Sequence, residues 1–277
     1  MSDVLVSATD LYTRLSSARE KDPVLLDVRW TLAEPDGRRA YSAGHLPGAV
    51  YVDLEHELAG PGSPEAGRHP LPTLADLQAA ARSWGVDDGA DVVVYDDAGG
   101  TAAARAWWLL RWGGHPSVRI LDGGLAAWAR VGGILEDGDV RPHVGDVELA
   151  GGGMPTIDAD GAAAWAGILL DSRAGERFRG ESEPIDPRAG HIPGAVSAPT
   201  SDNLDPAGRF LGAEALRARF AALGIDGDVP VAAYCGSGVT ASHEIAALAA
   251  AGIPAALYPG SWSQWSNDPD RPAATGA

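Results

Sequence analysis

The sequence repeats itself across its two halves, and this duplication limits the possible folds more than any other feature. Four blocks recur in the same order, residues 25–29 with 169–173, 44–50 with 190–196, 93–96 with 232–235 and 121–128 with 258–265. The second pair reads Gly-His-Leu-Pro-Gly-Ala-Val against Gly-His-Ile-Pro-Gly-Ala-Val, 146 residues apart. We therefore expect a tandem duplication, with two domains of one fold in a chain of 277 residues.

Within each half, short apolar runs alternate with helical patterns. The predicted strands of the first half span residues 24–28, 49–52, 92–95 and 118–121. Residues 74–84 carry apolar side chains at helical spacing, and residues 216–223 form the matching stripe in the second half. Continuous apolar strands separated by helices predict an α/β fold, in which a parallel sheet is covered by helices on both faces.

The stretch between the two halves has little periodicity. Three glycines in a row, residues 151–153, mark it as a connection. We place the first domain at residues 1–140, a linker at 141–154 and the second domain at 155–277.

Cys235 is the only cysteine in the chain, and it follows the buried strand predicted at residues 231–234. Gly236 and Gly238 allow a tight loop, after which a helix is predicted to begin near Thr240. Backbone N–H groups that turn inward, together with a helix N-terminus, stabilise an anion and lower the pKa of a thiol. A lone cysteine is most often an inert buried residue, but this setting predicts a reactive thiolate.

Composition narrows the classes of partner. There are 21 Lys and Arg residues against 38 Asp and Glu, for a formal net charge of −17, so a nucleic-acid backbone is not an expected partner. One cysteine excludes an intramolecular disulfide and a multi-cysteine metal site. No apolar run approaches the ~18 residues of a membrane span, and the first residues lack a signal-peptide pattern. We expect a cytoplasmic protein without a membrane partner.

The joint occurrence of these motifs resembles the two-domain rhodaneses, which comprise thiosulfate and 3-mercaptopyruvate sulfurtransferases. The resemblance rests on Cys-Gly-Ser-Gly-Val-Thr-Ala after a strand, the doubled Gly-His-[Leu/Ile]-Pro-Gly-Ala block, and the Asp-Gly-Gly-Leu and Pro-Gly-Ser-Trp turns. It implies that each half is a doubly wound domain with a central parallel sheet. It also implies that the C-terminal half is catalytic, because Asp96 stands where the second half has Cys235.

The resemblance implies a ping-pong reaction through a Cys235 persulfide. Sulfane sulfur would pass from a small anionic donor, 3-mercaptopyruvate or thiosulfate, to cyanide, a small thiol or a reduced thioredoxin-like protein. No metal and no cofactor is expected. The amides of the loop would hold the sulfur, and their residues are Gly236, Ser237, Gly238, Val239 and Thr240. The hydroxyl of Thr240 either contacts the sulfur or caps the helix.

A donor that carries negative charge requires a cation, and Arg177 matches the family's first substrate-binding arginine. The alternative is a surface arginine in an acidic loop. A second arginine of mercaptopyruvate enzymes follows a Glu-Pro pair, but Ile185 stands there in this chain, and Arg188 is not a residue-for-residue substitute. Thiosulfate-preferring relatives place cations directly after the cysteine, whereas Gly236 and Ser237 are neutral. We therefore expect 3-mercaptopyruvate to be preferred.

Mercaptopyruvate enzymes of this family have also been assigned a Ser–His–Asp relay. By that analogy, the relay would consist of Ser237, His45 from the Gly-His-Leu-Pro-Gly block, and Asp36. In the alternative interpretation, His45 and its repeat mate His191 only satisfy hydrogen bonds beneath a turn.

Two other functions fit the sequence less well. A cysteine phosphatase needs an arginine in the loop, but residues 235–243 contain no basic residue apart from His243. A non-catalytic sulfur-carrier or regulatory module fits the inert first half, but not the intact cysteine loop of the second half.

Overall fold

The computed structural model describes residues 4–17 and 22–277, which form two compact units. Unit 1 consists of the described residues up to Leu58, together with Pro72–Met154 and Pro206–Phe210. Unit 2 consists of Ala59–Leu71, Pro155–Asp205 and Leu211–Ala277. Each unit contains an α/β domain, so the predicted fold class is confirmed.

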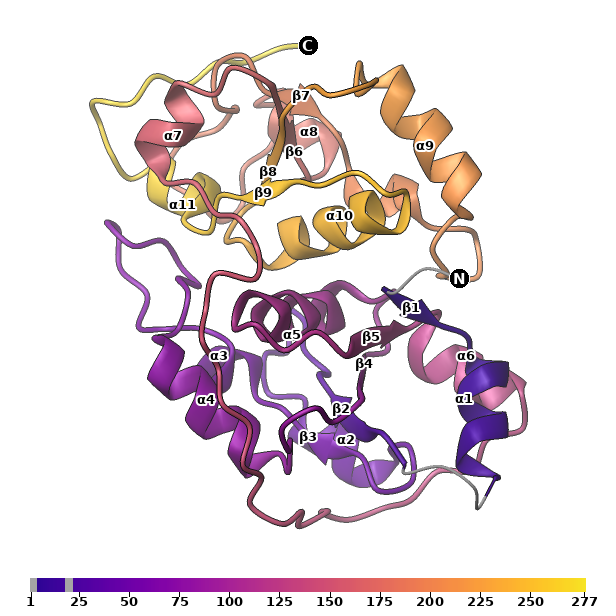
Figure 1. Ribbon diagram of the computed structural model, residues 1–277. Helices are drawn as coiled ribbons and strands as arrows, with labels where there is room; N and C mark the ends of the chain where they lie inside the picture. Colours follow the sequence, from indigo (N-terminus) through magenta and orange to yellow (C-terminus); the bar gives the residue numbers. More distant parts are fainter. Residues whose placement is uncertain (1–3, 18–21) are drawn as a thin grey trace. The chain divides into compact units, whose positions relative to one another are not determined.

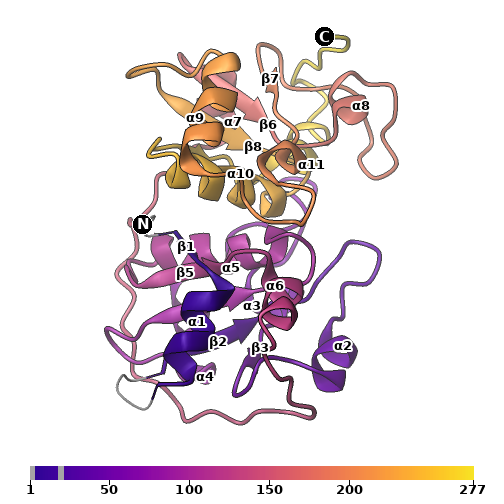
Figure 2. The same cartoon turned by 90° about the vertical axis from the view of Figure 1, so that its right-hand side faces the viewer.

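Unit 1 is built on a five-stranded parallel sheet with the strand order β1-β5-β4-β2-β3. Its strands are β1 (Leu5–Val6), β2 (Val24–Asp27), β3 (Val50–Tyr51), β4 (Val92–Tyr95) and β5 (Val118–Leu121). Figure 2 shows β1 at one edge of this sheet and β3 at the other. All four residues of β4 are buried, as expected of a central strand covered on both faces.

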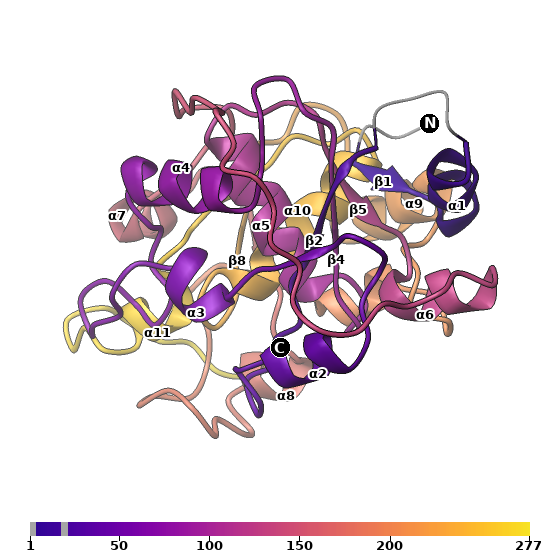
Figure 3. The same cartoon turned by 90° about the horizontal axis from the view of Figure 1, so that it is seen from below.

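Helices cover both faces of this sheet. They are α1 (Ala8–Leu15), α2 (Arg38–Ala43), α3 (Leu54–Glu57), α4 (Leu74–Ser83), α5 (Thr101–Trp112) and α6 (Gly124–Arg130). Helices α1 and α6 pack in one apolar cluster with alternate strand residues, including Leu25, Val93 and Leu121. In Figure 3, α3 and α4 lie on the opposite side of β2 and β4 from α1.

Unit 2 repeats this architecture around a four-stranded parallel sheet with the order β7-β6-β8-β9. Its strands are β6 (Ile168–Asp171), β7 (Val196–Ser197), β8 (Val231–Tyr234) and β9 (Ala256–Leu257). Its helices are α7 (Ala159–Ala163), α8 (Gly175–Phe178), α9 (Ala213–Ala222), α10 (Val239–Ala250) and α11 (Ser261–Trp265), with a 3₁₀ turn η1 (Thr200–Asn203). Helices α7 and α11 share an apolar cluster on one side of the strands, and α9 and α10 lie on the other (Figure 1).

The units do not follow the boundaries that the sequence suggested. Residues 141–154, expected as a linker, pack on unit 1, where Val147 and Leu149 are buried and the Val147 N–H donates to the Val86 carbonyl. Ala59–Leu71 lies in the first half of the sequence but belongs to unit 2. Conversely, Pro206–Phe210 belongs to unit 1, where the Phe210 N–H donates to the Asp122 carboxylate.

No helix in the described part of the chain is both long enough and apolar enough to cross a membrane.

Candidate active site

Cys235 lies directly after β8, with only 1% of its surface exposed. Its N–H donates to Oγ of Ser261 at 3.2 Å, and its carbonyl accepts the N–H of Trp262 at 2.9 Å. The next carbonyl, of Gly236, accepts the N–H of Ser263 at 2.8 Å. The start of α11 therefore fixes the backbone on both sides of the sulfur.

The sulfur atom accepts a hydrogen bond from the loop. Gly238 donates its N–H to Sγ of Cys235 at 3.1 Å. Gly238 has a φ of 81°, and a Cβ atom there would lie 2.7 Å from the Pro259 carbonyl oxygen, so this turn requires glycine. The other predicted amides, of Gly236, Ser237, Val239 and Thr240, remain predictions.

The helix after the loop begins one residue earlier than we expected. Helix α10 starts at Val239 with Gly238 as its N-cap, so of the two alternatives for Thr240 the capping role is wrong. Unpaired amides of a first helical turn point out of the helix end and favour an anion there. The Cys235 sulfur therefore lies beside the N-terminus of α10, where it accepts the N–H of the N-cap residue Gly238.

Ser261 is strained. It has a φ of 53° and is the one non-glycine residue with positive φ among the described residues. Gly124, its counterpart in the repeat, has a φ of 52°. The Ser261 hydroxyl donates to the Tyr258 carbonyl while it accepts the Cys235 N–H, so this side chain bonds the cysteine where the first half carries a glycine.

The histidine that contacts Ser237 is His69, which our sequence analysis did not single out. Its Nδ1 lies 2.7 Å from Oγ of Ser237, and both side chains are buried. His69 comes from the Ala59–Leu71 segment of unit 2. The repeat comparison offered no signal for it, because it lies in a loop outside all four matched blocks.

The described contacts of His45 and Asp36 lie within unit 1. Nδ1 of His45 lies 3.0 Å from the Tyr41 carbonyl, and its ring stacks on Tyr41 at 4.1 Å. His191 repeats this arrangement in unit 2 with Phe178, at 2.8 Å and 3.7 Å. Asp36 accepts the N–H of Arg38. This recurrence favours the structural interpretation of His45, and the hydrogen bond to Ser237 belongs to His69 instead.

Arg177 is held beside the loop by two carboxylates. Its Nε and Nη2 donate to Glu183 at 3.1 and 2.6 Å, and Nη2 also donates to Asp186 at 3.1 Å. Burial alone would raise the pKa of Glu183, but the hydrogen bonds from Arg177 and from the backbone of Asp186 and Ile185 outweigh it and lower the pKa. A position for Cβ on Gly236 lies 3.6 Å from Nη1 of Arg177, so the guanidinium group borders the cysteine loop.

Arg188 does not replace the missing second arginine. Its guanidinium group donates to four backbone carbonyls, those of Trp265, Ser266, Asp268 and Arg271. It therefore clamps the chain that follows α11.

The corresponding loop of unit 1 is filled by a carboxylate. Asp96 is fully buried, and each of its oxygens accepts two backbone N–H groups at 2.8–3.0 Å. The donors are Ala98, Gly100, Ala102 and Ala103. Asp96 thus fills its own loop with a carboxyl group where the loop of unit 2 carries the sulfur of Cys235.

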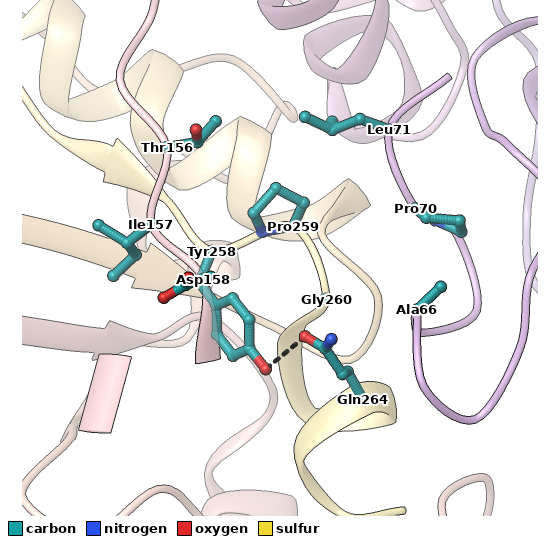
Figure 4. Close-up of a pocket in the computed structure, with 10 residues that line it drawn as sticks. All are labelled: Ala66, Pro70, Leu71, Thr156, Ile157, Asp158, Tyr258, Pro259, Gly260 and Gln264. Carbon is teal, nitrogen blue, oxygen red and sulfur yellow. Dashed lines mark hydrogen bonds between the residues drawn. The ribbon is translucent and has the colours of Figure 1, made fainter. Parts of the chain in front are cut away.

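A pocket of about 380 Å³ is lined entirely by residues of unit 2 (Figure 4). Pro259 and Gly260 form part of its wall, and the Tyr258 hydroxyl donates to Oε1 of Gln264 across it. Asp158 is the only charged residue in its lining, and its carboxylate caps α7. Neither Cys235 nor an arginine lines this pocket, so the cations for an anionic donor lie elsewhere.

Known proteins resemble this chain over nearly its whole length. The model of the rhodanese-like domain matches twice, at residues 7–131 and 157–268. A Mycobacterium tuberculosis protein named as a thiosulfate sulfurtransferase is 50% identical over 99% of this chain and 97% of its own. The 3-mercaptopyruvate sulfurtransferase of Escherichia coli is 36% identical over 90% of each chain.

Solved structures agree. SseA from Escherichia coli superposes with a TM-score of 0.81 and 32% identity, covering 93% of this chain and 98% of its own. Tum1 from Saccharomyces cerevisiae gives 0.87 and 25% identity over the full length of both chains. The expected resemblance and the sulfurtransferase class are confirmed. The chain belongs to the rhodanese-like family, as a two-domain member related over its whole length to sulfurtransferases.

Proposed function

We propose that this protein transfers sulfane sulfur through a persulfide on Cys235, with 3-mercaptopyruvate as the preferred donor over thiosulfate. The observation that carries the proposal is the sulfur of Cys235, which accepts the Gly238 N–H in a loop bordered by the guanidinium group of Arg177. A thiolate held this way is activated as a nucleophile without a metal or cofactor.

In the first step, the Cys235 thiolate attacks the donor sulfur. With 3-mercaptopyruvate, the new S–S bond forms as the C–S bond breaks, its electron pair passes to the donor's carbon, and that carbon gains the proton that the donor thiol loses. The products are a persulfide anion and pyruvate. With thiosulfate, the S–S bond of the donor breaks and sulfite leaves with the electron pair, so no proton moves.

Ser237 and His69 supply a route for that proton. A hydroxyl and an imidazole 2.7 Å apart can pass a proton from the donor thiol toward the carbon that becomes the methyl group of pyruvate. We assign these two residues to that role, with His69 in the place that sequence analogy gave to His45. This assignment gives Asp36, the expected carboxylate of the relay, no role.

In the second step, an acceptor removes the outer sulfur and regenerates the thiolate. Cyanide attacks the outer sulfur and leaves as thiocyanate, and a thiolate acceptor leaves as its own persulfide. A reduced thioredoxin-like protein is the macromolecular acceptor that we propose, in the cytoplasm.

The charges beside the loop favour a singly charged donor. The positive charge of Arg177 is already shared between Glu183 and Asp186, whose side chains are almost fully buried. A planar carboxylate can still take directed hydrogen bonds from a guanidinium group, whereas a dianion gains less from a cation whose charge two carboxylates already share. The neutral loop residues Gly236 and Ser237 point the same way.

Mass spectrometry of the intact protein tests the proposal. Incubation with 3-mercaptopyruvate should add one sulfur atom to the wild type and none to Cys235→Ser. Arg177→Ala should lower kcat/KM for 3-mercaptopyruvate by at least about tenfold. A wild type that gains no sulfur from either donor would support the non-catalytic module instead, and a higher kcat/KM with thiosulfate would overturn the donor preference.

A further inference from the structure

A second arginine faces the cysteine loop from a part of the chain where sequence reasoning did not expect one. Arg68 belongs to the Ala59–Leu71 segment of unit 2, and its backbone N–H donates to Oγ of Ser263 at 3.0 Å. The position of a Cβ atom on Gly236 lies 3.3 Å from Nη2 of Arg68 and 3.6 Å from Nη1 of Arg177. Two guanidinium groups from distant segments therefore converge beside the residue that follows Cys235.

Asp186 holds these two arginines together. Its Oδ1 accepts Nη1 of Arg68 at 2.9 Å, and its Oδ2 accepts Nη2 of Arg177 at 3.1 Å. The Asp186 side chain is only 2% exposed, so the carboxylate that joins the two arginines is buried. Because each oxygen serves a different arginine, the carboxylate fixes the spacing between the two guanidinium groups.

Donors remain on both arginines for a ligand. In residues 4–17 and 22–277, the hydrogen bonds of these side chains use Nη1 of Arg68 and Nε and Nη2 of Arg177. Nη2 of Arg68 and Nη1 of Arg177 are the two nearest atoms to the position of a Cβ atom on Gly236. Nε of Arg68 is also buried without a partner. An arginine arranged in this way is incompletely satisfied until an anion arrives.

We propose that Arg68 and Arg177 together bind the carboxylate of the sulfur donor, with Asp186 as the residue that positions them. This inference deepens the proposed function and rests on it for the identity of the donor. It assigns to Arg68 the second cationic contact that Ile185 cannot supply. The ligand class is a small monocarboxylate whose reactive atom reaches the Cys235 sulfur.

Alkylation of Cys235 tests the site without relying on sulfur transfer. The thiolate displaces iodide from both iodoacetate and iodoacetamide, but only iodoacetate carries a carboxylate. Because Cys235 is the only cysteine, the mass of the intact protein reports its reaction alone. The ratio of the two rate constants cancels any change in the thiolate pKa, since both reagents need the same thiolate.

Arg68→Met and Arg177→Met should each lower the iodoacetate-to-iodoacetamide rate ratio by about ten- to a hundredfold, the size of one charge-assisted hydrogen bond. Arg68→Lys should lower this rate ratio less, because lysine keeps the positive charge but lacks the paired N–H donors of a guanidinium group. Asp186→Ala should change the ratio in the same direction by releasing both arginines. Arg179→Met is the matched control, because Arg179 pairs with Glu181 on the surface, and its ratio should stay within about twofold.

Steady-state kinetics complete the test. Arg68→Met should raise KM for 3-mercaptopyruvate more than it lowers kcat. An unchanged rate ratio in Arg68→Met beside a reduced ratio in Arg177→Met would overturn the role of Arg68, as would a folded wild type that neither reagent alkylates. A wild type that forms no persulfide but whose iodoacetate preference depends on Arg68 would refute sulfur transfer and retain the carboxylate site.

Discussion

Nδ1 of His69 lies 2.7 Å from Oγ of Ser237, although the two residues come from different halves of the duplicated sequence. The contact forms because Ala59–Leu71 packs within unit 2, beside the turn that begins α11. The polar chemistry around Cys235 is therefore assembled from three stretches of chain, which contribute His69, Ser237 and Arg177.

His69→Gln should separate the two donors. Only 3-mercaptopyruvate requires a proton to move, so kcat with this donor should fall by roughly a hundredfold or more, whereas kcat with thiosulfate should change by less than about threefold. Ser237→Ala should have the same effect, and the double variant should be no slower than either single variant, because the two groups act as one unit. His56→Gln, which changes an exposed histidine, is the control. Equal losses with both donors would count against proton transfer.

At position 261, the glycine variant should be more stable than the alanine variant. Ser261→Ala leaves the buried Cys235 N–H without an acceptor, at a cost of about 1–3 kcal/mol, and keeps the positive φ. Ser261→Gly loses the same acceptor but relieves roughly 1 kcal/mol of backbone strain. We expect urea denaturation to rank the wild type above Gly and Gly above Ala. If Ala is the more stable variant, the strain assigned to this residue is absent.

Asp96→Ala should destabilise the protein without removing its chemistry. Three buried N–H groups, and a fourth on the exposed residue Ala98, lose their acceptor, so the free energy of unfolding should fall by at least about 3 kcal/mol. Turnover per folded molecule should change by less than about tenfold, because this loop carries no sulfur. The exposed neighbour gives the control, Asp97→Ala. Complete loss of activity in the folded Asp96→Ala protein would show that the first half takes a direct part.

Acid should weaken the contact between Arg177 and Glu183. The pKa of Glu183 is lower in the folded protein than the ordinary value of 4.5, so its ionised form stabilises the fold at pH values above 4.5. This contribution is lost as the pH falls below 4.5 and through the folded-state value. The difference in melting temperature between the wild type and Glu183→Gln should therefore shrink from pH 7 to pH 3.5. A difference that is independent of pH would contradict this assignment, and Glu148→Gln, at an exposed position, controls for general charge effects.

The elements that the sequence predicted well are those with a local signal. The strand at Val92–Tyr95 and the loop at Cys235 followed from a buried apolar run and from glycines at a strand-to-helix turn. His69 and Arg68 could not be found in this way. Their segment is positioned by contacts such as that between Arg68 and Ser263, which are 195 residues apart in sequence, and no local pattern encodes such docking.

The repeat comparison was informative about the loop of the first half but not about the limits of the domains. It identified Asp96 as the counterpart of Cys235, and the structure shows what that carboxylate does in its loop. The domain limits rested on the glycine-rich stretch instead, and Val147 and Leu149 within it are buried on unit 1 through tertiary contacts that such sequence does not reveal.

Ala59–Leu71 from the first half belongs to unit 2, and Pro206–Phe210 from the second half belongs to unit 1. This exchange of segments limits which pieces of the gene can encode a complete unit. A gene fragment that encodes only residues 155–277 would keep the nucleophile but would lack His69 and Arg68. The half of the sequence that carries Asp96 thus also carries a segment that packs in the unit of Cys235. Because each unit contains a segment from the other half of the sequence, the two halves are not interchangeable modules, and deletion of either half would remove a segment of the other half's unit.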